Sequence, residues 1–209
     1  MKVSEIFSPT IQGEGNSVGM ISTFVRLSGC NLSCQFCDSK YANKGTDMGV
    51  DYVSKKVHSM GIENVIFTGG EPMLQREELS QVMGALQKLN SNYKFYLETN
   101  GTIYDNILKF FEGVSCSPKK QSQQYDYSKI SKLKDVRFKF VYEDKNDKWW
   151  ESFIDKYQIP RNKVWIMPEG KTKKEQMKKM KEVVSYCLEK KFNFSPRLHI
   201  LIYSRRRGV

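Results

Sequence analysis

Three cysteines lie within eight residues of this chain, at Cys30, Cys34 and Cys37. Thiolates this close together converge on a single metal ion or cluster, because the loop between them is too short to reach two sites. Three protein ligands leave one coordination position open, and an open position is typical of catalytic rather than structural centres. The spacing therefore indicates a centre at which chemistry takes place.

A structural zinc ion is the simplest alternative for these thiols. Such sites use four protein ligands, commonly two cysteine pairs, and the chain has no second pair. His58 falls in a predicted helix without a partner, and His199 is far away in the sequence. Cys116 and Cys187 belong to apolar stretches, so we expect both to be core residues. An iron–sulfur cluster held by the three clustered cysteines is the favoured interpretation.

The pattern of apolar residues predicts the elements that position these cysteines. Strands are expected at 21–28, 64–68, 93–97, 114–116, 136–142, 164–167 and 198–203. Helices are expected at 51–60, after 72, around 107–111, from 147 to 157 and at 172–190, and residues 1–20 look loop-rich. Strands that alternate with helices imply a parallel sheet with right-handed crossovers. With about six strands and few helices, we expect an α/β fold, an incomplete (partial TIM-type) parallel β/α barrel formed by residues 1–209 as one domain.

The composition limits the partners of the chain. Its net charge of +11 fits either an anionic partner or a solvated lysine surface. Many of the lysines lie on or just before the predicted helix 172–190, with few aromatics between them, so we expect no direct nucleic-acid partner. No apolar run approaches the ~18 residues that a membrane span needs, and no apolar segment of a signal peptide follows Lys2. We therefore expect a cytoplasmic protein without membrane contact.

The cysteine spacing, with the aromatic Phe36 before the third cysteine, resembles that of the radical S-adenosylmethionine superfamily. There a [4Fe-4S] cluster binds the methionine end of S-adenosylmethionine at its open iron and supplies the electron that releases a 5′-deoxyadenosyl radical. The segment 69–72, Gly-Gly-Glu-Pro, follows the next predicted strand and resembles the superfamily's motif for the methionine amino group. A glycine pair allows close backbone approach, and Glu71 offers an acceptor to an ammonium.

Further segments resemble one family within that superfamily, the 7-carboxy-7-deazaguanine synthases of queuosine-type 7-deazapurine biosynthesis. The matching segments are 5–7 with 10–15, 24–32, 37–39, 67–72, 98–101, 117–119 and 195–199. The resemblance implies a lyase that converts 6-carboxy-5,6,7,8-tetrahydropterin to 7-carboxy-7-deazaguanine with loss of ammonia. It also implies that S-adenosylmethionine is regenerated, that Mg²⁺ assists, that a flavodoxin or ferredoxin donates the electron, and that the enzyme is a homodimer.

The resemblance also carries roles to individual residues. Cys30, Cys34 and Cys37 would hold the cluster. S-adenosylmethionine would contact Phe36, Cys37, Asp38, Gly69, Gly70, Glu71, Ser117, Pro118 and Lys119. The pterin would contact Ile11, Gln12, Gly13, Glu14, Arg26 and Thr68, with Arg26 as a bidentate clamp on its carboxylate. Ser39 would bind Mg²⁺ through its hydroxyl, where the family often has threonine. We expect His199 to be an ordinary strand residue.

Two other functions remain open at this point. A glycyl-radical activating enzyme shares the cysteine spacing and the Gly-Gly-Glu motif, but it would have little use for the loop 12–15 or for Arg26. A basic nucleic-acid-binding module with a structural metal would contain zinc and no iron, and its binding would be sensitive to salt.

Overall fold

The fold is an open, mostly parallel barrel. The computed structural model describes residues 1–35, 37, 39–204, 206 and 208. Its sheet has the order β3-β1-β2-β4-β5-β6-β7-β8-β9, and every neighbouring pair from β2 to β9 is parallel. The strands are β1 (Lys2–Ile11), β2 (Ile21–Leu27), β3 (Thr46–Asp47), β4 (Asn64–Gly69), β5 (Lys94–Thr99), β6 (Gly113–Cys116), β7 (Val136–Tyr142), β8 (Val164–Pro168) and β9 (Asn193–Phe194). In the described part of the chain β3 and β9 are the two ends of the sheet, which confirms an incomplete barrel.

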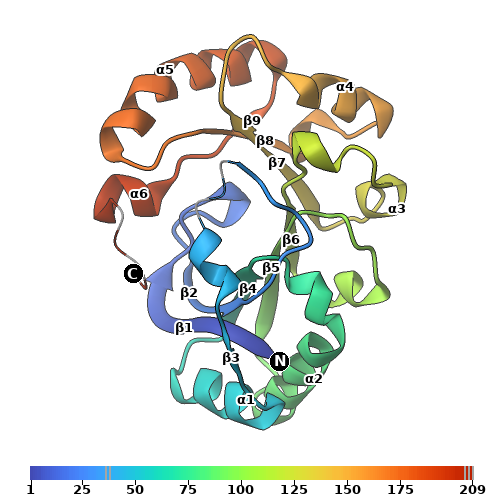
Figure 1. Ribbon diagram of the computed structural model, residues 1–209, viewed down its shortest axis with the longest axis vertical. Helices are drawn as coiled ribbons and strands as arrows, with labels where there is room; N and C mark the ends of the chain where they lie inside the picture. Colours follow the sequence, from blue (N-terminus) through green and yellow to red (C-terminus); the bar gives the residue numbers. More distant parts are fainter. Residues whose placement is uncertain (36, 38, 205, 207, 209) are drawn as a thin grey trace.

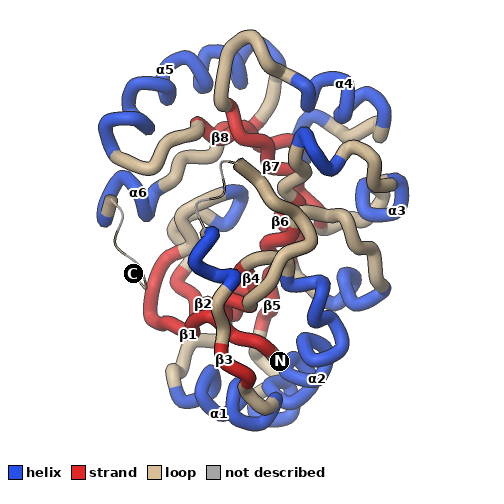
Figure 2. The backbone as a smooth tube through the Cα atoms, in the orientation of Figure 1, coloured by secondary structure: helices blue, strands red, loops and turns tan. Residues whose placement is uncertain are grey.

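The helices lie outside the curved sheet (Figure 1, Figure 2). They are α1 (Val50–Ser59), α2 (Arg76–Leu89), α3 (Ser128–Ser131), α4 (Trp149–Lys156), α5 (Lys173–Lys190) and α6 (Leu198–Tyr203). The short 3-10 turns are η1 (Gly15–Ser17), η2 (Lys40–Asn43), η3 (Pro72–Gln75), η4 (Asn106–Phe110), η5 (Lys120–Ser122) and η6 (Arg161–Lys163). The helix expected around 107–111 is therefore only the 3-10 turn η4. The helix expected from residue 147 begins at Trp149. Asp147 forms an ion pair with Lys120 Nζ at 2.7 Å.

Strand β1 corrects the expectation that residues 1–20 are loop-rich. It pairs antiparallel with β2, and β3 then pairs with β1. The register shifts twice, between Val3 and Glu5 and between Phe7 and Thr10. Because each shift interrupts the alternation of inward and outward side chains, the sequence does not display the period of two that identifies a strand.

The chain end also differs from the prediction, since residues 198–203 form helix α6 rather than a strand. The N–H of Ile200 and that of Leu201 both donate to the Arg197 carbonyl, which closes the first helical turn. The N–H of Leu198 donates to the carbonyl of Gly13 at 2.8 Å. This contact fastens α6 to the loop that follows β1, on the open side of the barrel.

Alternation along the strands separates an apolar outer face from a polar inner face. Val25, Leu27 and Phe67 are fully buried and belong to the core that also contains Val53 of α1 and Leu79 of α2. Each such side chain contributes roughly 1.5–3 kcal/mol by leaving water. The residues that alternate with this outer set point to the barrel interior, and near the carboxyl ends of the strands they are Arg26, Thr68, Glu98, Ser115 and Lys139. Cys116 and Cys187 are buried, as expected.

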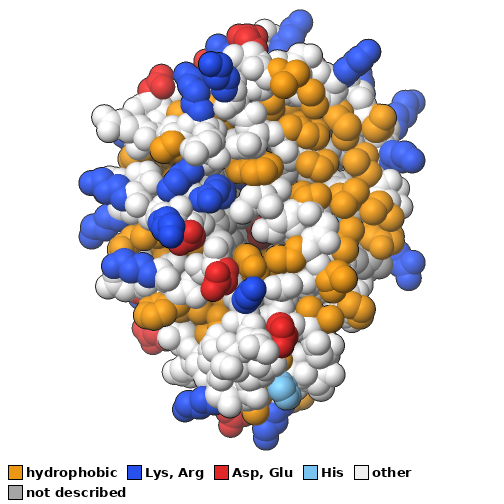
Figure 3. Space-filling view, turned by 180° about the vertical axis from the view of Figure 1, so that it is seen from behind, with side chains coloured by type: hydrophobic (Ala, Val, Ile, Leu, Met, Phe, Trp, Pro, Cys, Tyr) orange, Lys and Arg blue, Asp and Glu red, His pale blue; other side chains and the backbone are white. Residues whose placement is uncertain are grey.

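On the face shown in Figure 3, lysine and arginine side chains lie mostly toward the edges, and hydrophobic side chains gather over one half of the face. Among the described residues no helix has both the length and the hydropathy needed to span a membrane.

Candidate active site

The cysteine loop begins where β2 ends. The end of β2 and the first residues of the loop accept hydrogen bonds from the turn that follows β4. The N–H of Gly70 donates to Leu27 at 3.1 Å, and that of Glu71 donates to Gly29 at 2.8 Å. A Cβ at Gly69 would collide with the Leu27 backbone, and one at Gly70 would collide with the Gly29 carbonyl. Gly69 also has φ of +134°, which a side chain rarely permits. The glycine pair is therefore required for this close approach.

The carboxylate of Glu71 points into the protein. It is fully buried, and Oε1 accepts from Thr99 Oγ1 at 2.7 Å and from the Met73 N–H at 3.0 Å. Oε2 accepts from the Asn100 N–H at 2.7 Å. Burial raises the pKa of Glu71, although these hydrogen bonds oppose the rise. Both oxygens thus accept from the turn that follows β4 or from the end of β5, and the expectation that Glu71 also accepts from an ammonium stays a prediction.

Asn100 connects this buried carboxylate to the cysteine loop. Its side-chain amide donates to Asn31 Oδ1 at 3.0 Å and approaches Cys30 Sγ at 4.0 Å. On the other side of the loop, the amide of Gln121 donates to Cys34 Sγ at 3.5 Å. Two neutral N–H donors thus lie against two of the three sulfurs.

The three thiols influence one another electrostatically. Burial raises the pKa of Cys30 and of Cys34, and the neighbouring Cys37 raises both further. Lys119 acts in the opposite direction on the pKa of Cys34. In the described ranges no three His, Cys, Asp or Glu side chains are placed to hold one metal ion. A cubane cluster separates its thiolates more widely than one ion does, so three mutually interacting thiols with N–H donors beside them fit an iron–sulfur cluster.

The turn 117–119 follows β6 next to this loop. The N–H of Ser117 donates to the Thr99 carbonyl at 2.7 Å, which joins the ends of β5 and β6. Its hydroxyl donates to the carbonyl of Lys139 at 2.9 Å and accepts from Lys119 Nζ at 3.0 Å. The turn therefore joins the carboxyl end of β6 to those of β5 and β7.

A second polar cluster fills the barrel interior. Lys139 Nζ lies 2.6 Å from Glu14 Oε2 and 2.8 Å from Glu98 Oε2. Gln12 donates its side-chain amide to Glu98 Oε1 at 2.9 Å, and Arg197 Nε donates to Glu14 Oε1 at 2.9 Å. These side chains come from the loop after β1, from β5, from β7 and from the residue before α6. The cluster thus assembles only when these four segments come together in the folded chain.

In this cluster the opposite charges of Glu14 and Lys139 each stabilise the ionised form of the other. Burial alone would raise the pKa of Glu14, but Lys139, Arg197 and His199 hold it well below its ordinary value. Burial alone would lower the pKa of Lys139, but Glu14 and Glu98 raise it above its ordinary value. Both groups are therefore charged at neutral pH. His199 Nε2 lies 3.8 Å from Glu14 Oε1, so this residue belongs to the cluster and not to a strand as expected.

Arg26 and Thr68 are neighbours across β2 and β4. Arg26 Nε pairs with Glu5 Oε1 at 2.6 Å, and its guanidinium lies 5.8 Å from the ring centre of Phe7 and 5.7 Å from that of Tyr41. The partner comes from β1, which the sequence pattern did not reveal. The ion pair fixes Nε and orients the guanidinium along the inner face of the sheet.

The structure also describes Ile11, Gly13 and Ser39 among the predicted site residues. Ile11 ends β1 opposite Ile21, and a Cβ at Gly13 would collide with the ring of His199. Ser39 precedes η2, and its carbonyl accepts from the Ala42 N–H at 2.8 Å. Phe36 and Asp38 lie outside the described residues.

Four residues of the interior cluster were not predicted as site residues from the sequence, namely Glu98, Lys139, Arg197 and His199. Lys139 lies between Phe138 and Phe140 in the sequence. The same alternation is found in strands whose polar face is exposed to solvent, so the pattern does not show that Lys139 is buried. Glu98 and Arg197 lie in two of the segments that resemble the family, 98–101 and 195–199. That resemblance was the signal by which they could have been found.

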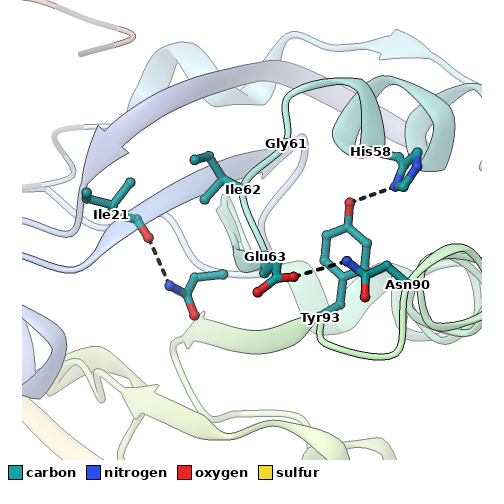
Figure 4. Close-up of a pocket in the computed structure, with 8 residues that line it drawn as sticks. Ile21, His58, Gly61, Ile62, Glu63, Asn90 and Tyr93 are labelled. Atoms are coloured by element: carbon teal, nitrogen blue, oxygen red, sulfur yellow. Dashed lines mark hydrogen bonds between the residues drawn. The ribbon is translucent and has the colours of Figure 1, made fainter.

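A pocket lies at the end of the barrel opposite to the cysteine loop. It has a volume of about 350 Å³ and is lined by residues at the amino-terminal ends of β2, β4 and β5. Figure 4 shows His58 Nδ1 facing the Tyr93 hydroxyl at 3.1 Å and Asn90 donating to Glu63 at 3.1 Å. His58 is therefore engaged far from the cysteines and is not a fourth ligand to them.

Comparisons with known proteins agree with this arrangement. Residues 24–117 match the Radical SAM superfamily. The chain is 33% identical to a 7-carboxy-7-deazaguanine synthase of Hyperthermus butylicus over 97% of its own length and 92% of the relative's. It is 32% identical to the 7-carboxy-7-deazaguanine synthase of Pyrobaculum aerophilum over 100% and 97% of the two chains. The crystal structure of QueE from Escherichia coli shares the fold, with a TM-score of 0.73 at 19% identity, and covers 95% of this chain and 94% of its own.

Proposed function

The chain belongs to the 7-carboxy-7-deazaguanine synthase family of the radical S-adenosylmethionine superfamily, and from this premise we infer which of its residues perform the reaction. The reaction converts 6-carboxy-5,6,7,8-tetrahydropterin to 7-carboxy-7-deazaguanine with loss of ammonia. The observation that carries this function is the match to curated synthases over nearly the whole chain, including the cysteine loop and the loop at Glu14.

The enzyme uses a [4Fe-4S] cluster and S-adenosylmethionine, which together supply a 5′-deoxyadenosyl radical when they are bound. We propose that Cys30, Cys34 and Cys37 hold the cluster. The amides of Asn100 and Gln121 support this assignment, since N–H donors to ligand sulfurs stabilise their negative charge.

Phe36, Cys37, Asp38, Gly69, Gly70, Glu71 and the turn Ser117, Pro118 and Lys119 would form the S-adenosylmethionine site. The buried hydrogen bonds of Glu71 favour contact through the backbone of the Gly-Gly-Glu turn rather than through the carboxylate. In this proposal Glu71 and the glycine pair position the turn against the cysteine loop.

Ile11, Gln12, Gly13, Glu14, Arg26 and Thr68 would bind the pterin in the barrel interior. The ionised carboxylate of Glu14 can accept from the N–H edge of the pyrimidine ring, and Arg26 can pair with the substrate carboxylate. Mg²⁺ would bind the hydroxyl of Ser39 and substrate oxygens, since this ion takes few protein ligands.

We further propose that residues 1–209 act as one domain, that the enzyme is a homodimer, and that a flavodoxin or ferredoxin supplies the electron. A cytoplasmic location would suit the three reduced thiols, because disulfides do not persist in that compartment.

An anaerobic assay tests the proposed function. Purified enzyme with a reconstituted cluster is incubated with the carboxy-tetrahydropterin, S-adenosylmethionine and a reductant, and the product is identified by mass spectrometry. We expect 7-carboxy-7-deazaguanine, and we expect a Cys30→Ala, Cys34→Ala, Cys37→Ala variant to lose both the brown colour and the product. Absence of the product from a reduced, cluster-replete sample would contradict the proposal.

A further inference from the structure

Lys139 carries a buried charge at the centre of the barrel. It lies in β7 between Phe138 and Phe140, which are fully buried, and it is itself only 4% exposed. A charged side chain at such a place requires partners, because an isolated ammonium inside a protein is strongly destabilising. The two partners are Glu14, 2.6 Å away, and Glu98, 2.8 Å away.

The hydrogen bonds of the two carboxylates leave acceptor capacity for a ligand. Glu14 takes Arg197 on Oε1 and Lys139 on Oε2, whereas Glu98 takes Gln12 on Oε1 and Lys139 on Oε2. Each oxygen thus receives one of these donors, and a carboxylate offers about four acceptor positions in total. Both carboxylates can therefore bind further N–H groups as long as they stay ionised.

Lys139 supplies the positive charge that the two carboxylates share. Without its ammonium, Glu14 and Glu98 would share a buried region in which Arg197 is the strong cation on Glu14. Like charges in such surroundings favour the uptake of a proton by one of the two groups. A protonated carboxyl group would present a donor where the pyrimidine edge needs an acceptor.

We propose that Lys139 is a positioning residue of the substrate pocket, which keeps Glu14 and Glu98 charged and in place as acceptors for the N–H edge of the 2-amino-4-oxopyrimidine ring. This inference rests on the proposed function and extends it to a residue that does not itself need to touch the substrate. The charged and titratable groups around Glu14 are Lys139 from β7, Glu98 from β5, and Arg197 and His199 from the segment of α6. Lys139 is the member that contacts both carboxylates.

The backbone of Lys139 strengthens the inference. Its carbonyl accepts from Ser117 Oγ, in the turn proposed for S-adenosylmethionine. Strand β7 therefore both positions the Lys139 side chain and contacts the turn 117–119 proposed for the cofactor.

The test is anaerobic binding of the carboxy-tetrahydropterin to cluster-replete enzyme with S-adenosylmethionine, measured across the neutral pH range. The variants are Lys139→Met and Lys139→Arg. The control is Lys179→Met, which removes from α5 a partly exposed ion pair with Glu169, a residue that follows β8. Lys139→Met should weaken binding roughly 10- to 100-fold near neutral pH, with a smaller loss at higher pH as the carboxylates ionise. Lys139→Arg should keep the pH profile of the wild type, and iron content and S-adenosylmethionine binding should not change in any variant.

Wild-type-like substrate binding by Lys139→Met, or a loss that does not vary with pH, would overturn the proposal. If Lys139→Met does not fold, Lys139→Arg decides, because a pH-dependent loss in a variant that keeps the charge would also overturn it. Failure of the wild type to bind the pterin would instead reject the proposed function, whatever the variants do.

Discussion

The backbone N–H of Asn100 donates a 2.7 Å hydrogen bond to Glu71 Oε2, and this bond ties the end of β5 to the turn that follows β4. Because the side chain of Asn100 also reaches Asn31, the same residue carries the connection into the cysteine loop. The cluster site thus depends on buried polar contacts between strands that are adjacent in the sheet but distant in sequence.

Glu71→Gln tests the importance of that carboxylate. Both oxygens of Glu71 receive donors, so the amide NH₂ of glutamine would face at least one of them and leave it unpaired. We expect the free energy of unfolding in urea to fall by about 1–3 kcal/mol. Glu169→Gln, which alters a half-exposed ion pair, should cost less than about 1 kcal/mol. Equal, small effects of the two substitutions would contradict this role.

Gly70→Ala tests the close approach between the β4 turn and the cysteine loop. Its Cβ would collide with the Gly29 carbonyl and displace Cys30, so we expect a loss of roughly 1–3 kcal/mol in stability and a reduced iron and sulfide content. Gly84→Ala is the matched control, because a Cβ there meets nothing within 4 Å in α2. That change should raise stability by up to about 1 kcal/mol and leave the iron content intact.

Glu14 makes the free energy of unfolding depend on pH in the acidic range. Its pKa is lower in the folded state than its ordinary value of 4.5, so the unfolded chain binds more protons in the interval between the two values. The stabilisation is complete above pH 4.5 and is lost as the pH falls through the folded pKa. Urea unfolding at a series of acidic pH values should show this decline, and Glu14→Gln should reduce its slope. Glu189→Gln, at an exposed site, should leave the slope unchanged.

Ser39 is proposed to bind magnesium through its hydroxyl. Ser39→Ala should raise the Mg²⁺ concentration for half-maximal activity by at least roughly tenfold, as the loss of a metal contact commonly does. Ser39→Thr keeps the hydroxyl and restricts its rotamers, so it should match or exceed the wild type. An Mg²⁺ titration in which all three proteins coincide would place the ion elsewhere.

The sequence predicted the parallel strands from β2 to β8 and the position of the cysteine loop, because apolar runs and glycines directly reflect burial and close backbone approach. It did not predict the short parallel strand β9. It missed β1, where two register shifts interrupt the alternation, and with β1 it missed Glu5 as the partner of Arg26. The segment 198–203 was wrongly predicted as a strand, since six apolar-rich residues fit either element and the contact of Leu198 with Gly13 is tertiary.

The interior cluster could not be found from pattern alone. A lysine that alternates with Phe138 and Phe140 looks the same whether it faces solvent or the inside of a barrel. Only the curvature of the folded sheet brings Lys139 to Glu14, which lies 125 positions earlier in the chain.

The most direct test of the central claim is the ratio of 7-carboxy-7-deazaguanine formed to S-adenosylmethionine cleaved, measured anaerobically with reduced, cluster-replete enzyme. Family membership predicts that S-adenosylmethionine is regenerated, so many molecules of product should form for each molecule cleaved. Cleavage of S-adenosylmethionine in proportion to time without any deazaguanine would contradict the account and would instead favour a radical enzyme that acts on another substrate.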